Sequence, residues 1–293
     1  MRNGIKIIVI AFLLSTLMVS CIYDNFPNHR QCDISLRLVN SRGAVLSDSV
    51  AHLYNIDWFV NGIYQRTVAA EKDGKYRVTF NSTDRVTLVA IAASDTSECR
   101  VNSPILGESI KDTWLQLKTG GENTSPQPHA IYYGDLDVTP EADVSDDDPA
   151  KSYTILMKDM RAKVRVEIKG LKTRFGDGNY RIVLEGLRSG IAYDGSVTGV
   201  LVNYDMKGSF DSQGNYTTLP DEVLPTKSGE QVRIRVYKED GSLLFDRDVD
   251  EKGEPLQVKK NDDIVFVINA TYLTDLTVTV VPWADIENPT SFQ

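Results

Sequence analysis

Apolar and polar residues alternate along four well-separated runs of this chain, at residues 34–38, 164–168, 232–236 and 276–280. Each run places an apolar side chain at every second position, with Ser, Thr, Arg or Glu between them. Because successive side chains of a strand point to opposite faces, this period predicts strands with one buried and one solvated face.

Residue pairs that favour tight turns stand between the predicted strands. They are Asn61-Gly62, Asp73-Gly74, Asp177-Gly178, Gly214-Asn215 and Asp240-Gly241. Such pairs tolerate the positive φ that hairpin turns require. The nearest candidate for an amphipathic helix, residues 109–117, is short and fits a turn leading into a strand equally well. Many short strands with regular turns predict an all-β fold built from β-sandwiches.

The middle of the chain marks a domain boundary. Residues 141–150 read EADVSDDDPA, an acidic stretch without an apolar pattern, between the strand-like segments 131–138 and 153–157. Each flanking half has about the size of one sandwich. We therefore predict two all-β domains, at residues 33–150 and 151–293. The acidic stretch is either a linker or a long loop just before the boundary.

The first twenty residues have the organisation of an export signal. Two positive charges, Arg2 and Lys6, precede an apolar stretch that begins at Ile7. This stretch is shorter than the roughly 20 residues that a membrane-spanning helix needs. The pattern therefore predicts a cleaved signal peptide at residues 1–20 rather than a retained anchor helix.

The residue after this leader is Cys21, in the sequence Leu-Met-Val-Ser-Cys. The segment resembles a lipobox, in which the cysteine thiol receives a diacylglycerol, although Met18 stands where Leu is usual. Two or more acyl chains anchor a protein stably where one gives only marginal binding. We expect a lipoprotein held to a membrane through Cys21, with a tether over residues 21–32.

Composition narrows the range of functions. Hydrophobic residues make up 41% of the chain and charged residues 25%, as in globular proteins. The net charge is −9, and removal of the leader with Arg2 and Lys6 makes the protein more negative still. Such an acidic chain argues against nucleic acid as a partner. Zinc-protease, nucleophile-elbow and phosphate-loop motifs are all missing from the sequence. We predict no enzymatic activity, no catalytic residue and no cofactor.

Metal sites are not predicted either. The histidines His29, His52 and His129 are isolated, without the paired spacing of a zinc site. Alternating carboxylates at residues 246–250 imitate the start of a calcium loop, but Gly253 comes two places too late. Spacing by two instead puts these carboxylates on one solvated face of a strand.

With Cys21 acylated, Cys32 and Cys99 are the remaining cysteines. An oxidising compartment favours a disulfide between them, and two separate buried thiols are the alternative. Sequence does not supply the Cα separation that a bridge requires, so both alternatives stay open.

Several short segments, in their order and spacing, resemble the FimB-type minor fimbrial anchor family of Bacteroidota. They are Cys21–Asn25 followed by Cys32, Ile131–Leu136, Met157–Val166 followed by Gly170-Leu171, and Val280–Trp283. The chain departs from the family at Arg161-Ala162, where Asn or Thr is frequent. The resemblance implies two tandem transthyretin-like β-sandwich domains and a role at the base of a fimbria, on the surface side of the outer membrane.

The resemblance also implies a partner. Related pilin subunits join by donating a β-strand to a neighbour, and an open sheet edge suits that contact. We expect a fimbrial shaft subunit to bind by strand donation or edge contact. We expect the protein to be attached to the membrane through its covalent lipid. The C-terminal segment is the candidate subunit contact, with the apolar side chains of Leu276, Val278, Val280 and Trp283. Such an anchor tethers the shaft and limits its length.

A surface glycan-binding lipoprotein of a polysaccharide-uptake system is the alternative, because it shares the leader, the acidity and the tandem β-domains. Such a protein needs an exposed aromatic platform. Trp58, Trp114, Trp283 and the pair Tyr132-Tyr133 are the candidate aromatic residues. Aromatic side chains inside alternating runs more often pack within the sheet, which favours the anchor.

Overall fold

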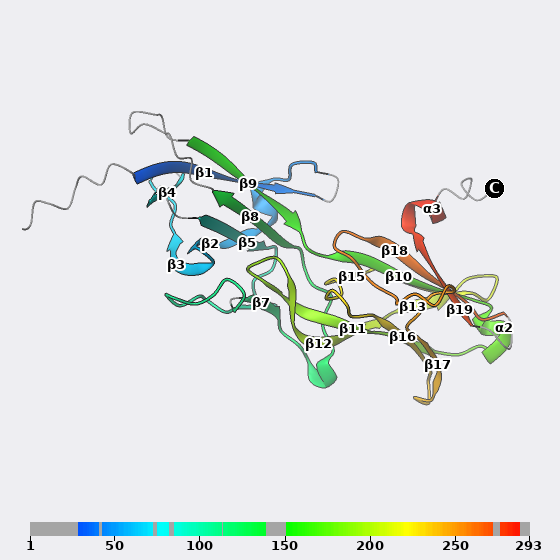
Figure 1. Ribbon diagram of the computed structural model, residues 1–293. Helices are drawn as coiled ribbons and strands as arrows, with labels where there is room; N and C mark the ends of the chain where they lie inside the picture. Colours follow the sequence, from blue (N-terminus) through cyan, green and yellow to red (C-terminus); the bar gives the residue numbers. More distant parts are fainter. Residues whose placement is uncertain are drawn as a thin grey trace, which may run out of the picture.

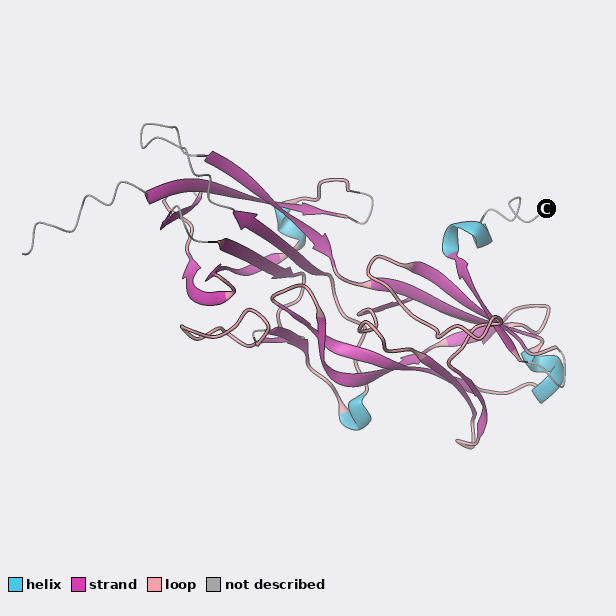
Figure 2. Ribbon diagram, in the orientation of Figure 1, coloured by secondary structure: helices cyan, strands magenta, loops and turns pink. Residues whose placement is uncertain are grey.

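The computed structural model describes residues 29–40, 43–72, 75–81, 85–112, 114–138, 151–271 and 276–287. The predicted signal peptide, Cys21 and the acidic stretch 141–150 lie outside these residues. As predicted, the fold is all-β, and its strands form two lobes of an elongated molecule (Figures 1 and 2). Within the described residues, no helix has the length and apolar character needed to cross a bilayer.

The first lobe is built on a seven-stranded sheet. Its order is β3 (Ile63–Val68), β2 (His52–Val60), β5 (Val86–Ala93), β8 (Ile131–Val138), β9 (Lys151–Asp159), β1 (His29–Val39) and β4 (Tyr76–Asn81). β8 and β9 pair only through Tyr132 with Asp159 and Tyr133 with Lys158. The sheet bends at this short junction. β9 and β1 run parallel, and the other neighbours are antiparallel.

The bend brings two layers of this sheet face to face as a sandwich. Alternate residues of both layers, among them Ile34, Leu88 and Ile155, are buried in the core between them. The predicted alternation of the first run is confirmed, since Ile34 is buried and Ser35 and Arg37 are exposed.

A third layer covers the opposite face of β5 and β8. It consists of β6 (Cys99–Val101), β7 (Trp114–Leu117) and the end of the long strand β11 (Tyr180–Ala192). Phe59, Ile91, Leu115 and Tyr193 lie in the core beneath it. Because β5 is buried on both faces, its residues are apolar at every position except Thr87 instead of alternating.

The second lobe is a sandwich of two sheets. One has the order β13 (Gly208–Phe210), β14 (Tyr216–Thr218), β10 (Ala162–Lys169), β18 (Asp263–Asn269) and β19 (Thr277–Pro282), with β15 (Asp221–Val223) also on β10. The other contains β17 (Leu243–Arg247), β16 (Arg233–Lys238) and β11, with β12 (Val197–Met206) also on β11. Val166, Leu184 and Phe266 lie in their common core.

Helical segments are short and peripheral. They are the 3₁₀ helices η2 (Asp48–Val50) and η3 (Gly121–Asn123) and the α-helices α2 (Leu171–Phe175) and α3 (Trp283–Glu287). Each has only three to five residues, and Figure 2 shows that strands make up most of the structure.

The strand β11 belongs to both lobes. Residues 180–185 pair with β16 in the second lobe, and residues 190–192 pair with β7 in the first. Leu184 is accordingly buried in the second-lobe core, and Ile191 lies in the core beneath the third layer. Gly186, with a φ of 87°, stands at the irregularity between the two halves. Backbone hydrogen bonds of one sheet therefore run from lobe to lobe.

The predicted boundary at residue 150 does not coincide with the change of lobe. β9, which the sequence analysis assigned to the second domain, pairs in parallel with β1 over residues 32–39. The chain enters the second lobe only after Met160 and Arg161. Likewise, β1 begins at His29, inside the predicted tether. Alternation indicates which face of a strand is buried but not which strand lies beside it. The sequence therefore showed neither the pairing of β9 with β1 nor the residue at which β1 begins.

Candidate functional site

β19, the strand within the predicted C-terminal contact, lies at an edge of its sheet. It pairs with β18 along its whole length, from Thr277 opposite Asn269 to Pro282 opposite Ile264. Among the described strands, none pairs with its outer side. An edge strand presents unpaired N–H and C=O groups to an incoming strand. Part of this edge is already engaged, because the Val278 carbonyl accepts the Glu251 N–H at 2.9 Å and the Leu276 carbonyl accepts the Arg247 Nε–H at 2.9 Å. The position therefore suits strand addition over the part of β19 beyond these contacts.

The apolar side chains of this segment differ in burial. Val278 is fully buried in the second-lobe core, and Leu276 packs against the margin of that core. Val280 is two residues further on and so lies on the same face as Val278, yet it is 38% exposed. Val278 holds β19 in place, whereas Val280 leaves an apolar side chain at the open rim of the sandwich.

Trp283 is turned back onto its own lobe. It begins α3, and the guanidinium carbon of Arg165 lies 3.4 Å from the centroid of its ring. Arg165 belongs to β10, which is separated from β19 by β18. A cation over an indole face at this distance is attracted by the ring quadrupole. The indole therefore has a partner within the chain, which the sequence pattern did not show.

The two lobes interlock where the β11–β12 hairpin reaches the first lobe. Tyr193, just past β11, is fully buried, and its ring centroid lies 6.0 Å from that of Phe59. The Tyr133 hydroxyl on β8 donates a 3.1 Å hydrogen bond to the Tyr193 carbonyl. Burial raises the pKa of both tyrosine hydroxyls well above the usual range, so both stay neutral. The turn at Gly195, with a φ of 77°, lies against the Tyr133 ring.

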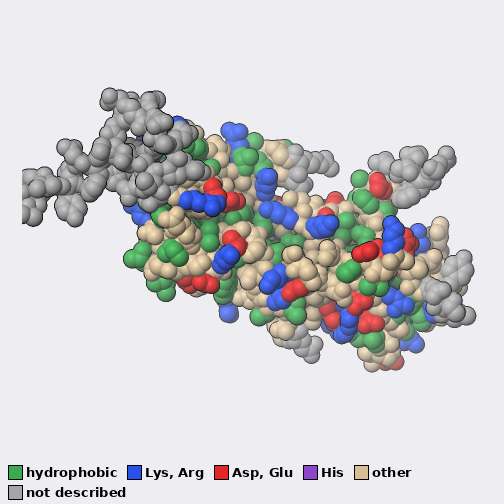
Figure 3. Space-filling view, in the orientation of Figure 1, with side chains coloured by type: hydrophobic (Ala, Val, Ile, Leu, Met, Phe, Trp, Pro, Cys, Tyr) green, Lys and Arg blue, Asp and Glu red, His purple; other side chains and the backbone are tan. Residues whose placement is uncertain are grey.

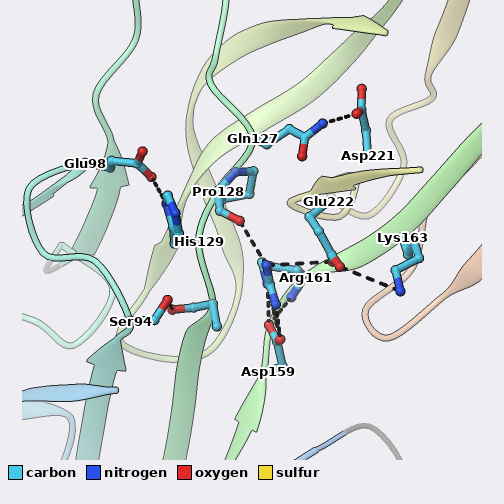
Figure 4. A network of polar contacts seen from close by, with 11 residues as sticks. Ser94, Glu98, Gln127, Pro128, His129, Asp159, Arg161, Lys163, Asp221 and Glu222 are labelled. Atoms are coloured by element: carbon cyan, nitrogen blue, oxygen red, sulfur yellow. Dashed lines mark hydrogen bonds and ion pairs between the residues drawn. The ribbon is translucent and has the colours of Figure 1, made fainter. Parts of the chain in front are cut away.

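Arg161 joins three segments at the short crossover between the lobes (Figure 4). Its guanidinium donates to the Asp159 carboxylate, with the shortest bond at 2.7 Å, and to the Pro128 carbonyl at 3.0 Å. The Glu222 carboxylate on β15 lies 3.8 Å away. The Arg161 side chain is only 16% exposed. Because charge-assisted bonds strengthen where water is scarce, this arginine clamps the crossover to both lobes.

Asp221 is a buried carboxyl beside the same junction. It is 3% exposed, and its carboxylate accepts a hydrogen bond from the Gln127 amide (Figure 4). Burial raises the pKa of Asp221 from 3.8 to about 6, while Lys207 acts in the opposite direction. Asp221 also lines a surface cavity of ≈ 330 Å³ together with Tyr204. This carboxyl therefore changes charge at a higher pH than an ordinary aspartate.

Three side chains that could hold a metal come together in the fold. Asp95, Glu98 and His129 each place one ligand atom within 4.8 Å of the others. His129 Nδ1 lies 2.6 Å from the Glu98 carboxylate, and this contact raises the pKa of His129 (Figure 4). An ion pair between His129 and Glu98 accounts for their short distance. A metal ion would have to break this ion pair in order to bind. The sequence showed no motif because His129 and Glu98 are far apart along the chain.

The predicted cysteine pair lies in two different cores. Cys32 on β1 is a buried thiol between the two layers of the seven-stranded sheet. Cys99 on β6 is a buried thiol beneath the third layer, on the opposite face of β5. These positions correspond to the second alternative of the sequence analysis, two separate buried thiols.

The carboxylates at residues 246–250 are engaged by groups of the protein. Asp246 and Asp248 lie 3.7 and 2.7 Å from the Arg233 guanidinium. Asp250 accepts two backbone N–H groups of the turn that follows. The sequence analysis expected these carboxylates on one solvated face of a strand, and it did not show their partners within the chain.

The family model of the fimbrillin-A associated anchor proteins Mfa1 and Mfa2 matches residues 59–288. The chain belongs to this family. The resemblance drawn from short segments is thereby confirmed at the level of fimbrial anchor and assembly proteins. A comparison with curated proteins gives no match.

Solved structures share the fold of this Mfa2-family chain over nearly their whole length. The fimbrial anchor protein Mfa2 from Porphyromonas gingivalis superposes with a TM-score of 0.61 at 16% identity, covering 87% of this chain and 98% of that one. A candidate adhesin from Bacteroides ovatus gives 0.57 at 13% identity, covering 89% and 96%. A candidate polysaccharide-binding protein from Bacteroides thetaiotaomicron gives 0.56 at 14% identity, covering 86% and 98%. At such identities the likeness shows the fold alone.

The interlobe contacts of this Mfa2-family chain were not singled out by sequence reasoning. Two of the resembling segments, 131–136 and 157–166, nevertheless contain Tyr133 and Arg161. The segments that resemble the family therefore include two residues of the interlobe contacts. The sequence of these segments does not show that they contact the second lobe.

Proposed function

We propose that this chain is the lipid-anchored base of a fimbria. Acylated Cys21 holds it to the outer membrane, and the second lobe binds a fimbrial shaft subunit and limits the length of the shaft. The strongest support is membership of the Mfa2 anchor family, combined with one sheet that runs from the lobe next to Cys21 into the lobe that carries the open edge of β19.

A tether must keep its two lobes together under pulling force. The crossover between them consists of Met160 and Arg161 alone, which leaves no slack. Separation would also break the β11–β7 ladder and expose apolar residues such as Leu115 and Ile191 to water. Breaking several hydrogen bonds and wetting a core at once is costly, so the lobes act as one mechanical unit.

The shaft contact is placed at the outer side of β19. A strand added there, beyond the Glu251–Val278 hydrogen bond, would extend the sheet and cover the exposed Val280 side chain. The buried Val278 and the Trp283–Arg165 contact keep this edge in position for its partner. Three of the four predicted contact residues therefore support the edge, and Val280 faces the subunit.

Surface charge agrees with a protein partner. Basic and acidic side chains are interspersed over the face shown in Figure 3. That face offers no extended basic patch of the kind that binds a phosphate backbone. Together with the net charge of −9, this supports the prediction that nucleic acid is not a partner.

The substitution Cys21→Ala in the bacterium tests the tether. We expect the protein and its fimbriae to appear together in the culture medium, because acylation is the membrane attachment. Cys99→Ala, which alters a cysteine in the core, is the control and should leave both on the cells. Fimbriae that stay on cells whose Cys21→Ala protein is in the medium would refute the anchor role.

The substitution Val280→Lys tests the shaft contact. A charge at this exposed rim position opposes strand addition, so fimbriae should be shed while the protein itself stays in the membrane. Val200→Lys is the matched control, because Val200 is also exposed, at 46%, but lies on β12. Shedding by both variants, or by neither, would remove β19 as the contact.

A glycan-binding role is the second candidate, and one aromatic cavity favours it. Tyr180, Phe210 and Tyr216 line a surface cavity of ≈ 550 Å³ together with Asn179. Their ring centroids lie 5.1 to 6.1 Å apart in edge-to-face contacts, so the rings mainly pack against one another. Retention on immobilised polysaccharide that Phe210→Ala abolishes would establish this role, and lack of retention would exclude it.

A further inference from the structure

Two adjacent apolar side chains stand exposed at the tip of the loop before β7. Ile105 and Leu106 are 73% and 72% exposed, the highest values among the large apolar side chains of the described residues. We call this pair the apolar tip. Single exposed apolar residues are common on protein surfaces, but an adjacent aliphatic pair at a loop tip indicates a contact with another apolar surface.

The apolar tip is held in a defined turn. The Glu108 N–H donates to the Ile105 carbonyl at 2.9 Å, and the Glu108 carboxylate accepts the Ile105 N–H at 2.9 Å. Gly107, with a φ of 91°, occupies the third position, as a type II turn requires. A 2.8 Å bond from the Tyr64 N–H to the Glu108 carbonyl fastens the turn to β3. Burial of a preorganised tip costs little conformational entropy.

The apolar tip lies at the end of the first lobe where the described chain begins. Strand directions alternate from β9 through β8 and β5 to β2, and β9 is parallel to β1. β2 therefore ends, and β3 begins, at the end of the sheet where β1 starts with His29. The loop is attached there through the bridge between Ile63 and Ser109. Figure 1 shows the start of β1 and this loop at the same end, away from β19.

The distance from the lipid-bearing residue is short. Seven residues separate Cys21 from His29. Even fully extended, this segment spans no more than about 28 Å. A lipid on Cys21 thus keeps this end of the first lobe close to the bilayer surface, and the covalent link makes even a weak insertion an intramolecular event with a high effective concentration.

We propose that Ile105 and Leu106 insert into the lipid surface to which Cys21 is attached, an inference that rests on the lipid anchorage proposed above. The insertion is a second, shallow contact that fixes the orientation of the first lobe. With two points of attachment at one end, the lobe that carries β19 is directed away from the membrane. A lipid surface is favoured over a protein partner because the tip lies at the tethered end.

A fluorescent probe at the tip tests the insertion. The chain of residues 22–293, with an N-terminal histidine tag in place of Cys21, is bound to vesicles of phosphatidylethanolamine, phosphatidylglycerol and nickel-chelating lipid. Leu106→Cys carries an environment-sensitive label, which does not reach the buried Cys32 and Cys99. We expect a blue shift and several-fold stronger quenching by acyl-chain quenchers than with the label on Leu219→Cys. Leu219 is 63% exposed but lies in the second lobe, which makes it the matched control.

The outcomes separate this inference from the proposed function. Equal quenching at the two positions, or none at either, overturns the insertion. Shielding of the label at residue 106 that appears only after shaft subunits are added also overturns it and assigns the tip to a protein contact. Because the tag replaces the lipid, the result does not depend on natural acylation. Acylation is read separately, by incorporation of labelled fatty acid at Cys21 in cells, and its absence would contradict the proposed function.

Discussion

Single polar and charged residues near the junction take their properties mainly from partners that the fold brings to them. Arg161 is held by Asp159 and by the Pro128 carbonyl, and His129 is held by Glu98. Burial raises the pKa of the Asp221 carboxyl to about 6, although the Gln127 amide donates to it and the charge of Lys207 favours its ionised form. The sequence contains these residues, but the burial of Arg161 and Asp221 follows from the fold, as does the contact between the exposed His129 and Glu98.

The substitution Asp221→Asn tests the cost of this buried carboxyl. In the folded chain the carboxyl stays protonated up to about pH 6, whereas the unfolded chain ionises near 3.8. The contribution to stability is therefore fully present below that lower pKa and is lost as pH rises through about 6. The loss amounts to at most about 3 kcal/mol.

Urea denaturation at pH 4 and pH 7 measures this effect. The wild-type protein should lose more unfolding free energy between the two pH values than Asp221→Asn does. Near pH 4 the two proteins should differ little, because the carboxyl is then largely neutral in the folded state. Identical changes with pH in both proteins would show that Asp221 ionises normally.

At the scale of elements, β5 and β11 depart most from simple alternation. β5 is apolar at every position except Thr87 because cores lie on both of its faces. β11 changes core along its length, and Gly186 supplies the irregularity that lets it do so. An apolar-rich run of eight residues is consistent with a strand buried on both faces, whereas nothing in the sequence indicates the double role of β11.

The substitution Gly186→Ala tests that role. A Cβ at Gly186 would overlap the Gln231 carbonyl oxygen, and the φ of 87° is also unfavourable for alanine. Gly241, with a φ of 81° and open space around it, is the matched control. Gly241→Ala should cost about 1 kcal/mol of unfolding free energy from backbone strain alone. Gly186→Ala should cost more, about 2–4 kcal/mol, because steric overlap is added. Equal losses would mean that the backbone at Gly186 moves aside.

At the scale of the whole molecule, the two lobes form one unit. They share β11, are linked by a two-residue crossover, and interlock through Tyr133 and Tyr193. The first lobe would leave its third-layer core uncovered if the hairpin of β11 and β12 were removed. This architecture suits a protein that transmits force, and it makes independent folding of the lobes unfavourable.

The shared strand predicts a single unfolding transition. Calorimetry of residues 22–293 should give one peak, with the calorimetric enthalpy equal to the van't Hoff enthalpy. Tyr193→Ala, which removes the buried contact at the interlock, should lower the temperature of that one transition without splitting it. Two separate transitions in the wild-type protein would show that the lobes are only loosely joined.

The alternating residues by themselves determined the class of fold, because a period of two leaves only a half-buried strand as a stable solution. The order of several short segments determined the family. The alternation at residues 276–280 predicted a strand there, and β19 begins at Thr277 within that run. Only the tertiary structure decided that β9 belongs to the first lobe and that β11 serves two cores. It also decided that Trp283 turns back onto Arg165, and that Ile105 and Leu106 stand at the end of the first lobe where β1 begins. The physical reason is the same in each case: local alternation is satisfied by any neighbouring strand, whereas these features depend on which strand, far along the chain, lies alongside.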